Sequence, residues 1–79
     1  MVEHLTTVEP ARGLSDARRT ELAATLAALG FERRRGGRRA VFASTTLQPA
    51  YAKAQLRARG FADREFRIFL EYTRLWGFL

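Results

Sequence analysis

A six-residue pattern occurs twice in this chain and constrains its fold more than any other feature of the sequence. Leu-x-Ala-x-Gly-Phe fills residues 26–31 and, thirty positions later, residues 56–61. Glycine adopts the left-handed backbone conformation at little cost, and the apolar residue after it can pack back on a leucine in the last helical turn. Each copy therefore predicts the C-terminal end of a helix, and strand-like sequence follows both.

The first of these helices is predicted over residues 15–29. Ser15 is a good N-cap, and Asp16 suits the positive end of the helix dipole. Three leucines follow one another at helical spacing, which predicts a buried stripe: Leu22, Leu26 and Leu29.

The second helix is predicted over residues 47–59. Thr46 or Gln48 is the expected cap, and Pro49 falls in the first turn, where its missing N–H does no harm. Its expected buried face consists of residues at helical spacing: Leu47, Tyr51, Ala54 and Ala58. Arg57 and Arg59 are expected to lie outside that face.

Four segments have strand-like sequence. Residues 31–35 and 38–44 predict a hairpin around Gly36-Gly37, a pair that tolerates the positive φ of tight turns. Residues 64–76 give the clearest alternation of apolar and polar positions, whereas residues 2–8 have no clean period.

The predicted elements follow the order β-α-β-β-α-β, which is the ferredoxin-like arrangement. We therefore expect an α+β fold, in which a four-stranded antiparallel sheet carries both helices on one face. At 79 residues the chain is predicted to be a single domain over residues 1–79. Because it has no cysteine, the core alone or a second copy has to provide the stability.

Basic residues are concentrated in the middle of the chain. Residues 33–62 hold eight lysines and arginines and no acidic residue, whereas the rest of the chain holds six basic and eight acidic residues. Such a field favours an acidic partner, either nucleic-acid phosphates or a carboxylate-rich protein surface. The alternative for the arginine-rich strands is a charged sheet edge that resists aggregation. The excess of arginine over lysine is also explained by codon usage in a GC-rich genome.

The five arginines around the glycine pair give the strongest functional signal. Strand alternation puts Arg33 and Arg35 on one face and Arg34 on the other, so the hairpin presents positive charge on both sides. Arg38 and Arg39 divide in the same way. A basic hairpin tip of this kind can hold a phosphate backbone or dock into an acidic groove.

Two aromatic residues are expected on the sheet face away from the helices. Phe42 points outward if Val41 and Ala43 pack beneath the helices, and Phe69 points outward beside Arg67 if its strand neighbours face the core. RNA-recognition domains stack bases on such a face, but their signature is missing from residues 39–43, and a partner or dimer surface is the alternative. The predicted partner-binding residues are Arg33, Arg34, Arg35, Arg38, Arg39, Phe42, Arg57, Arg59, Arg67 and Phe69.

The sequence offers little catalytic or metal chemistry. It has one histidine, His4, and no cysteine, so a metal site lacks ligands. Ser15 and Ser44 have no motif or base that would activate them. We therefore expect a protein that is not an enzyme and has no cofactor.

The same sequence predicts a cytoplasmic protein that neither spans nor binds a membrane. No apolar run approaches the roughly 20 residues that span a bilayer, and the start of the chain lacks the pattern of a signal peptide. Large apolar residues fill positions 75–79, apart from a glycine. They are expected to fold back on the core, pair with a second copy in a homodimer, or contact a target.

In its small size, its predicted ferredoxin-like order and its lack of cysteine and catalytic motifs, the chain resembles the small phage-encoded anti-CRISPR inhibitors. The resemblance covers the whole chain and concerns format, without a diagnostic motif. It implies an inhibitor that binds a CRISPR effector in the cytoplasm of a bacterial host and blocks target DNA recognition. Many such inhibitors are acidic DNA mimics, whereas this chain carries a net charge of +6.

Two other functions fit the sequence. The first is a nucleic-acid-binding module that uses the arginine-rich hairpin on DNA or RNA phosphates. The second is a structural component of a virion.

Overall fold

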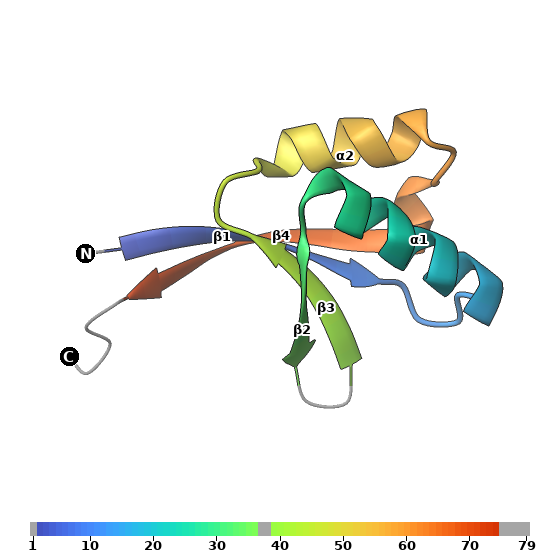
Figure 1. The fold of residues 1–79 in the computed structure, drawn as a ribbon, viewed down its shortest axis with the longest axis horizontal. Helices are drawn as coiled ribbons and strands as arrows, with labels where there is room; N and C mark the ends of the chain where they lie inside the picture. The colour runs from blue at the N-terminus through green and yellow to red at the C-terminus, as the bar shows by residue number, and fades with distance from the viewer. Residues whose placement is uncertain (1, 37–38, 75–79) are drawn as a thin grey trace.

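A computed structural model describes residues 2–36 and 39–74, which form a four-stranded antiparallel sheet with two helices on one face (Figure 1). The elements in chain order are β1 (Val2–Pro10), α1 (Asp16–Leu29), β2 (Glu32–Gly36), β3 (Arg39–Ser44), α2 (Pro49–Ala58), a 3-10 turn η1 (Asp63–Glu65) and β4 (Phe66–Arg74). The strand order is β2-β3-β1-β4. The expected α+β, ferredoxin-like arrangement is confirmed.

Some element boundaries differ from the prediction. β1 is longer than expected and lies in the interior of the sheet, where it pairs with β3 and β4. β4 begins two residues late because η1 occupies the preceding positions. Gly36 is the last residue of β2 and pairs with Arg39, whereas the prediction placed it in the turn with Gly37. Positions 37–38 and 75–79 lie outside the described residues, and with them Arg38 and the apolar C-terminal end.

The two Gly-Phe patterns end the helices in the same way. Their glycines have φ of 103° and 91°. The N–H of Phe31 donates to the carbonyl of Leu26 at 2.9 Å, and Phe61 repeats this bond to Leu56 at 3.0 Å. Both leucines are fully buried, and both phenylalanines lie in the core. The Schellman motif predicted from the repeat is therefore confirmed at both ends.

The predicted buried face of α2 is wrong. Its fully buried residues are Ala52 and Leu56, whereas Tyr51 is 45% exposed. The Schellman motif fixes Leu56 in the core, and at 100° per residue Ala52, four positions earlier, lies on the same side of the helix, whereas Tyr51 lies on the other side. Ala54 and Ala58 are accordingly exposed, and Leu47 packs against the core from the loop before the helix.

The assignment of Phe42 to the open sheet face is also wrong. Phe42 lies opposite Val8 of β1, and residues directly opposite each other in a sheet share a face. Val8 is fully buried under the helices, and Phe42 is 4% exposed within the same core cluster. Val41 and Ala43 therefore belong to the open face, and Phe42 offers no surface to a partner.

The sheet divides beyond Phe42. β1 pairs with β4 over nine residues, but with β3 only from Thr6 to Val8. β2 and β3 continue together past this point and extend away from β1 and the helices (Figure 1). We call this projecting part the basic hairpin; its described residues are 33–36 and 39–41. No helix within the described residues is both long and apolar enough to cross a membrane.

Candidate functional site on the basic hairpin

The basic hairpin carries charge on both of its faces. Arg33 lies opposite Phe42 and so shares the face that packs against the helices, whereas Arg34 lies opposite Val41 on the open face. Arg35 follows the alternation and shares the face of Arg33. Arg33 and Arg34 are both exposed. The predicted division of these arginines between the two faces is therefore confirmed at the level of strand register.

Arg33 and Arg34 are consecutive cations on the projecting strand, and in the described part of the chain both are unpaired, as are the exposed Arg12 and Arg59. Within residues 2–36 and 39–74, neither guanidinium group has a hydrogen-bond or ion-pair partner. Their hairpin projects into solvent, so both groups can reach an external anion without first breaking an internal bond. The described part of the basic hairpin therefore presents two unpaired cations.

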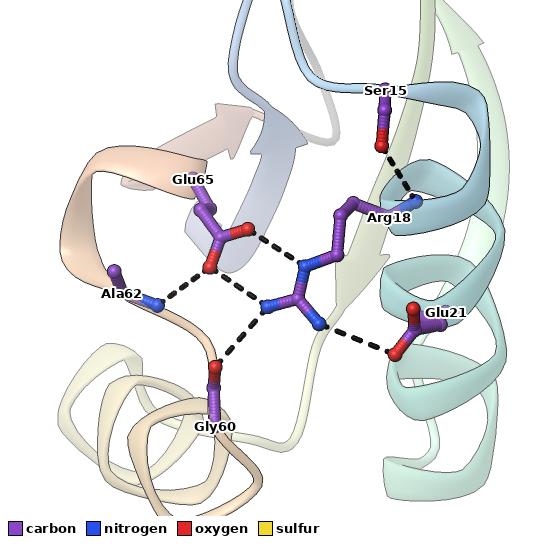
Figure 2. A network of polar contacts seen from close by, with 6 residues as sticks. All are labelled: Ser15, Arg18, Glu21, Gly60, Ala62 and Glu65. Atoms are coloured by element: carbon purple, nitrogen blue, oxygen red, sulfur yellow. Dashed lines mark hydrogen bonds and ion pairs between the residues drawn. The ribbon is translucent and has the colours of Figure 1, made fainter.

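Arg18, by contrast, is held in a network that joins α1 to the turn before β4 (Figure 2). Its Nε and one Nη donate to the two carboxylate oxygens of Glu65, each at 2.8 Å. The guanidinium also donates to the carbonyl of Gly60 at 3.1 Å and to Glu21 at 3.2 Å. It stacks over the ring of Phe61 at 4.3 Å. These contacts make Arg18 a structural residue.

Glu65 provides a test of that network. The hydrogen bond from Arg18, helped by the amide of Ala62 at 2.8 Å, lowers the pKa of Glu65 from 4.5 to about 2. A depressed pKa adds stability that is present above pH 4.5 and is lost as the pH falls through 2. We expect Glu65→Gln to be less stable than the parent at neutral pH, and the difference to shrink between pH 4.5 and 2. Chemical denaturation across this range measures it.

Glu21→Gln is the matched control. Glu21 is an exposed partner of Arg18 on the same helix, and such pairs contribute little. A parent and a Glu65→Gln variant that lose stability in parallel as the pH falls would contradict the assignment.

The arginines of α2 are not brought to the hairpin. The guanidinium of Arg57 binds both carboxylate oxygens of Asp63, with Nε at 2.7 Å, and Lys53 lies 3.7 Å from the same carboxylate. This pairing lowers the pKa of Asp63. Arg59 is exposed and caps the C-terminal end of α2.

Arg67 and Phe69 lie at the opposite edge of the sheet from β2. The guanidinium of Arg67 sits 5.1 Å from the ring centre of Phe69, and its Nη1 is 3.9 Å from a carboxylate oxygen of Glu9. Phe69 is 37% exposed on the open face. The predicted proximity of these two residues is confirmed, but β1 and β3 separate them from β2.

A small hollow opens where the hairpin leaves the sheet. Its volume is about 210 Å³, below the roughly 300–1,000 Å³ of most small-molecule sites. It is lined by Glu9, Pro10, Arg19, Thr20, Ala23, Arg33 and Phe42. The side chains of Arg19 and Thr20 already donate to backbone carbonyls of Leu14 and Asp16. Of the two lining arginines, Arg33 is the one whose guanidinium makes no hydrogen bond within residues 2–36 and 39–74.

The sequence did not reveal this hollow, because it depends on the divergence of β3 from β1 rather than on any local pattern. Among the described residues, no three histidines, cysteines or carboxylates gather as metal ligands do. The imidazole Nε2 of His4 is buried and has no partner within that part of the chain.

Comparisons with known proteins add no relative. No family model matches the chain, and searches of curated proteins and of solved structures find no significant match. A function for this chain therefore has to be inferred from its own residues.

Proposed function

We propose that this chain is a small, non-catalytic binding protein whose basic hairpin contacts an anionic partner. One observation carries the proposal: the hairpin projects from the sheet with Arg33 and Arg34 exposed and unpaired among the described residues, whereas Arg18, Arg57 and Arg67 face carboxylates. A guanidinium group matches the oxygen geometry of a carboxylate or a phosphate with two parallel hydrogen bonds. The hairpin is thus suited to either kind of anion.

We propose further that the partner is a CRISPR effector, whose recognition of target DNA the bound chain blocks. The small format supports this role, as does the concentration of free charge on one projecting arm. A hairpin placed on an acidic protein patch obstructs the path of the DNA. A hairpin placed on phosphates competes for the DNA itself.

Direct binding of nucleic acid is the second candidate. The free guanidinium groups on both faces favour it, because a hairpin that enters a groove meets phosphates on two sides. Its measurable signature is salt dependence. Each neutralised phosphate of B-DNA contributes about −0.9 to the slope of log K against log salt concentration.

For DNA binding through the hairpin, we expect the double variant Arg33→Ser, Arg34→Ser to bind duplex DNA of unrelated sequences more weakly by similar factors. The salt slope should become shallower by about 2, because two phosphate contacts are lost. Fluorescence anisotropy between 50 and 200 mM salt measures both effects.

The control variant is Arg12→Ser, Arg64→Ser, which removes the same charge from exposed positions outside the hairpin. If the two double variants behave alike, binding follows overall charge and the hairpin assignment fails. If the parent shows no measurable DNA binding, the partner is a protein surface.

A further inference from the structure

The two outer edges of the sheet have opposite character. β2 is five residues long and carries three consecutive arginines, so a second copy paired along it would bring like charges together. β4 is nine residues long and pairs only with β1 within the described part of the chain. Its central residues Phe69 and Leu70 are 37% and 42% exposed, on opposite faces. A long edge with exposed apolar residues on both faces is suited to strand pairing.

We propose that a second copy of this chain pairs antiparallel along the outer edge of β4, with Phe69 on the two-fold axis. Residues equally far from Phe69 then lie opposite each other. Arg67 lies opposite Glu71 of the second copy, and the symmetry repeats this pair on the other side of the axis. On the other face, Ile68 lies opposite Leu70 of the second copy. Charge therefore meets opposite charge, and apolar residue meets apolar residue.

Neighbouring registers fit less well. If the two-fold axis passes between two residues of β4, each residue on the helix face lies opposite a residue on the open face of the second copy. The two sheets then face in opposite directions. Centring it on Leu70 keeps the faces but puts Phe69 opposite Glu71 and Arg67 opposite Thr73. The register centred on Phe69 is the one that pairs the charges.

Arg67 has the capacity for this second contact. Its side chain is 63% exposed, and the 3.9 Å approach of one nitrogen to Glu9 leaves other guanidinium donors accessible. Its stacking on Phe69 holds the cation next to the axis. The resulting assembly is a continuous eight-stranded sheet with all four helices on one face and a basic hairpin at each outer edge. This inference does not depend on what the hairpin binds.

The absence of cysteine gives a direct test. Residues directly opposite in an antiparallel pair have Cα atoms about 4.5–5.5 Å apart, within the range of about 4.4–6.8 Å that a disulfide spans. Phe69→Cys should therefore form a disulfide-linked dimer on mild oxidation. Leu70→Cys and Arg34→Cys should not, because position 70 meets position 68 of the second copy and Arg34 lies on the opposite edge strand.

A charge exchange tests the register without removing Phe69. Sedimentation equilibrium at tens of micromolar should show a dimer of the 9.0 kDa parent. Arg67→Glu and Glu71→Arg should each raise the dissociation constant about tenfold, and the double exchange should restore it. Circular dichroism confirms that each variant is folded. A monomeric parent overturns the proposal, as does cross-linking at position 70 without cross-linking at position 69.

Discussion

Leu56→Ala is expected to lower the free energy of unfolding by about 2–5 kcal/mol, the usual cost of truncating a fully buried leucine. Leu56 is 0% exposed, and its carbonyl accepts the hydrogen bond that ends α2. Phe61 packs into the same core beside it. Small domains have only about 5–15 kcal/mol of stability in total, so this single change should remove a large part of it. Thermal denaturation should show the melting temperature falling by more than about 8 °C.

The equivalent change in the first repeat, Leu26→Ala, should have a similar effect, because Leu26 is equally buried and ends α1 in the same way. Tyr51→Ala is the control on the same helix as Leu56. Tyr51 is 45% exposed, and exposed substitutions usually change stability by no more than about 0.5 kcal/mol. A Leu56→Ala protein that melts within a degree or two of the parent would show that the repeat does not anchor the core.

Replacing the hairpin arginines should have the largest effect on binding. Because the sequence predicts solvent-exposed side chains around this turn, the variant with serine at Arg34, Arg35, Arg38 and Arg39 should fold almost as stably as the parent. Its partner binding should fall sharply and lose most of its salt dependence, since the guanidinium groups supply both steering and hydrogen bonds. If the target is a CRISPR effector, the parent should restore phage plaques on a strain with active interference, and this variant should not.

The outcome also separates the two kinds of partner. If the partner is nucleic acid, affinity for unrelated sequences should drop by similar factors, because phosphate contacts carry no sequence information. If it is a protein, naked nucleic acid should bind weakly to parent and variant alike. A control with serine at four cations outside the hairpin removes the same charge: Arg12, Lys53, Arg59 and Arg64. Full activity of the hairpin variant would move the functional surface to Phe69 and β4.

Much of the fold was predictable because its signals are local. The side chain of Ser15 accepts the N–H of Arg18 at 3.2 Å, as expected of an N-cap. The two Gly-Phe ends depend only on backbone conformation and on residues within one turn. The alternation in β4 was visible for the same reason. Together these signals were enough to give the order of helices and strands.

The errors concern relations between elements. Strand alternation allows two choices of face for β3, and only its register against β1 shows that Phe42 enters the core. The rotation of α2 follows from Leu56, and the repeat already placed this residue in the core; the wrong face came from including Leu47, which precedes the helix. The contact of Arg18 with Glu65 joins residues 47 positions apart, so no local pattern indicates it. For the candidate site, the sequence identified the arginines of the hairpin but did not indicate that the hairpin projects from the sheet.

That projection affects how such a protein can evolve. The hairpin joins the rest of the sheet through the short β1–β3 ladder at Thr6–Val8, and Arg33 and Arg34 of β2 are exposed. Substitutions at Arg33 or Arg34 therefore change the proposed binding surface while leaving the packing of the helices untouched. The hairpin can therefore change its binding specificity during evolution, for example when the target mutates, without a prior mutation that stabilises the fold. On the proposed function, selection for folding and selection for binding act on separate parts of the same 79 residues.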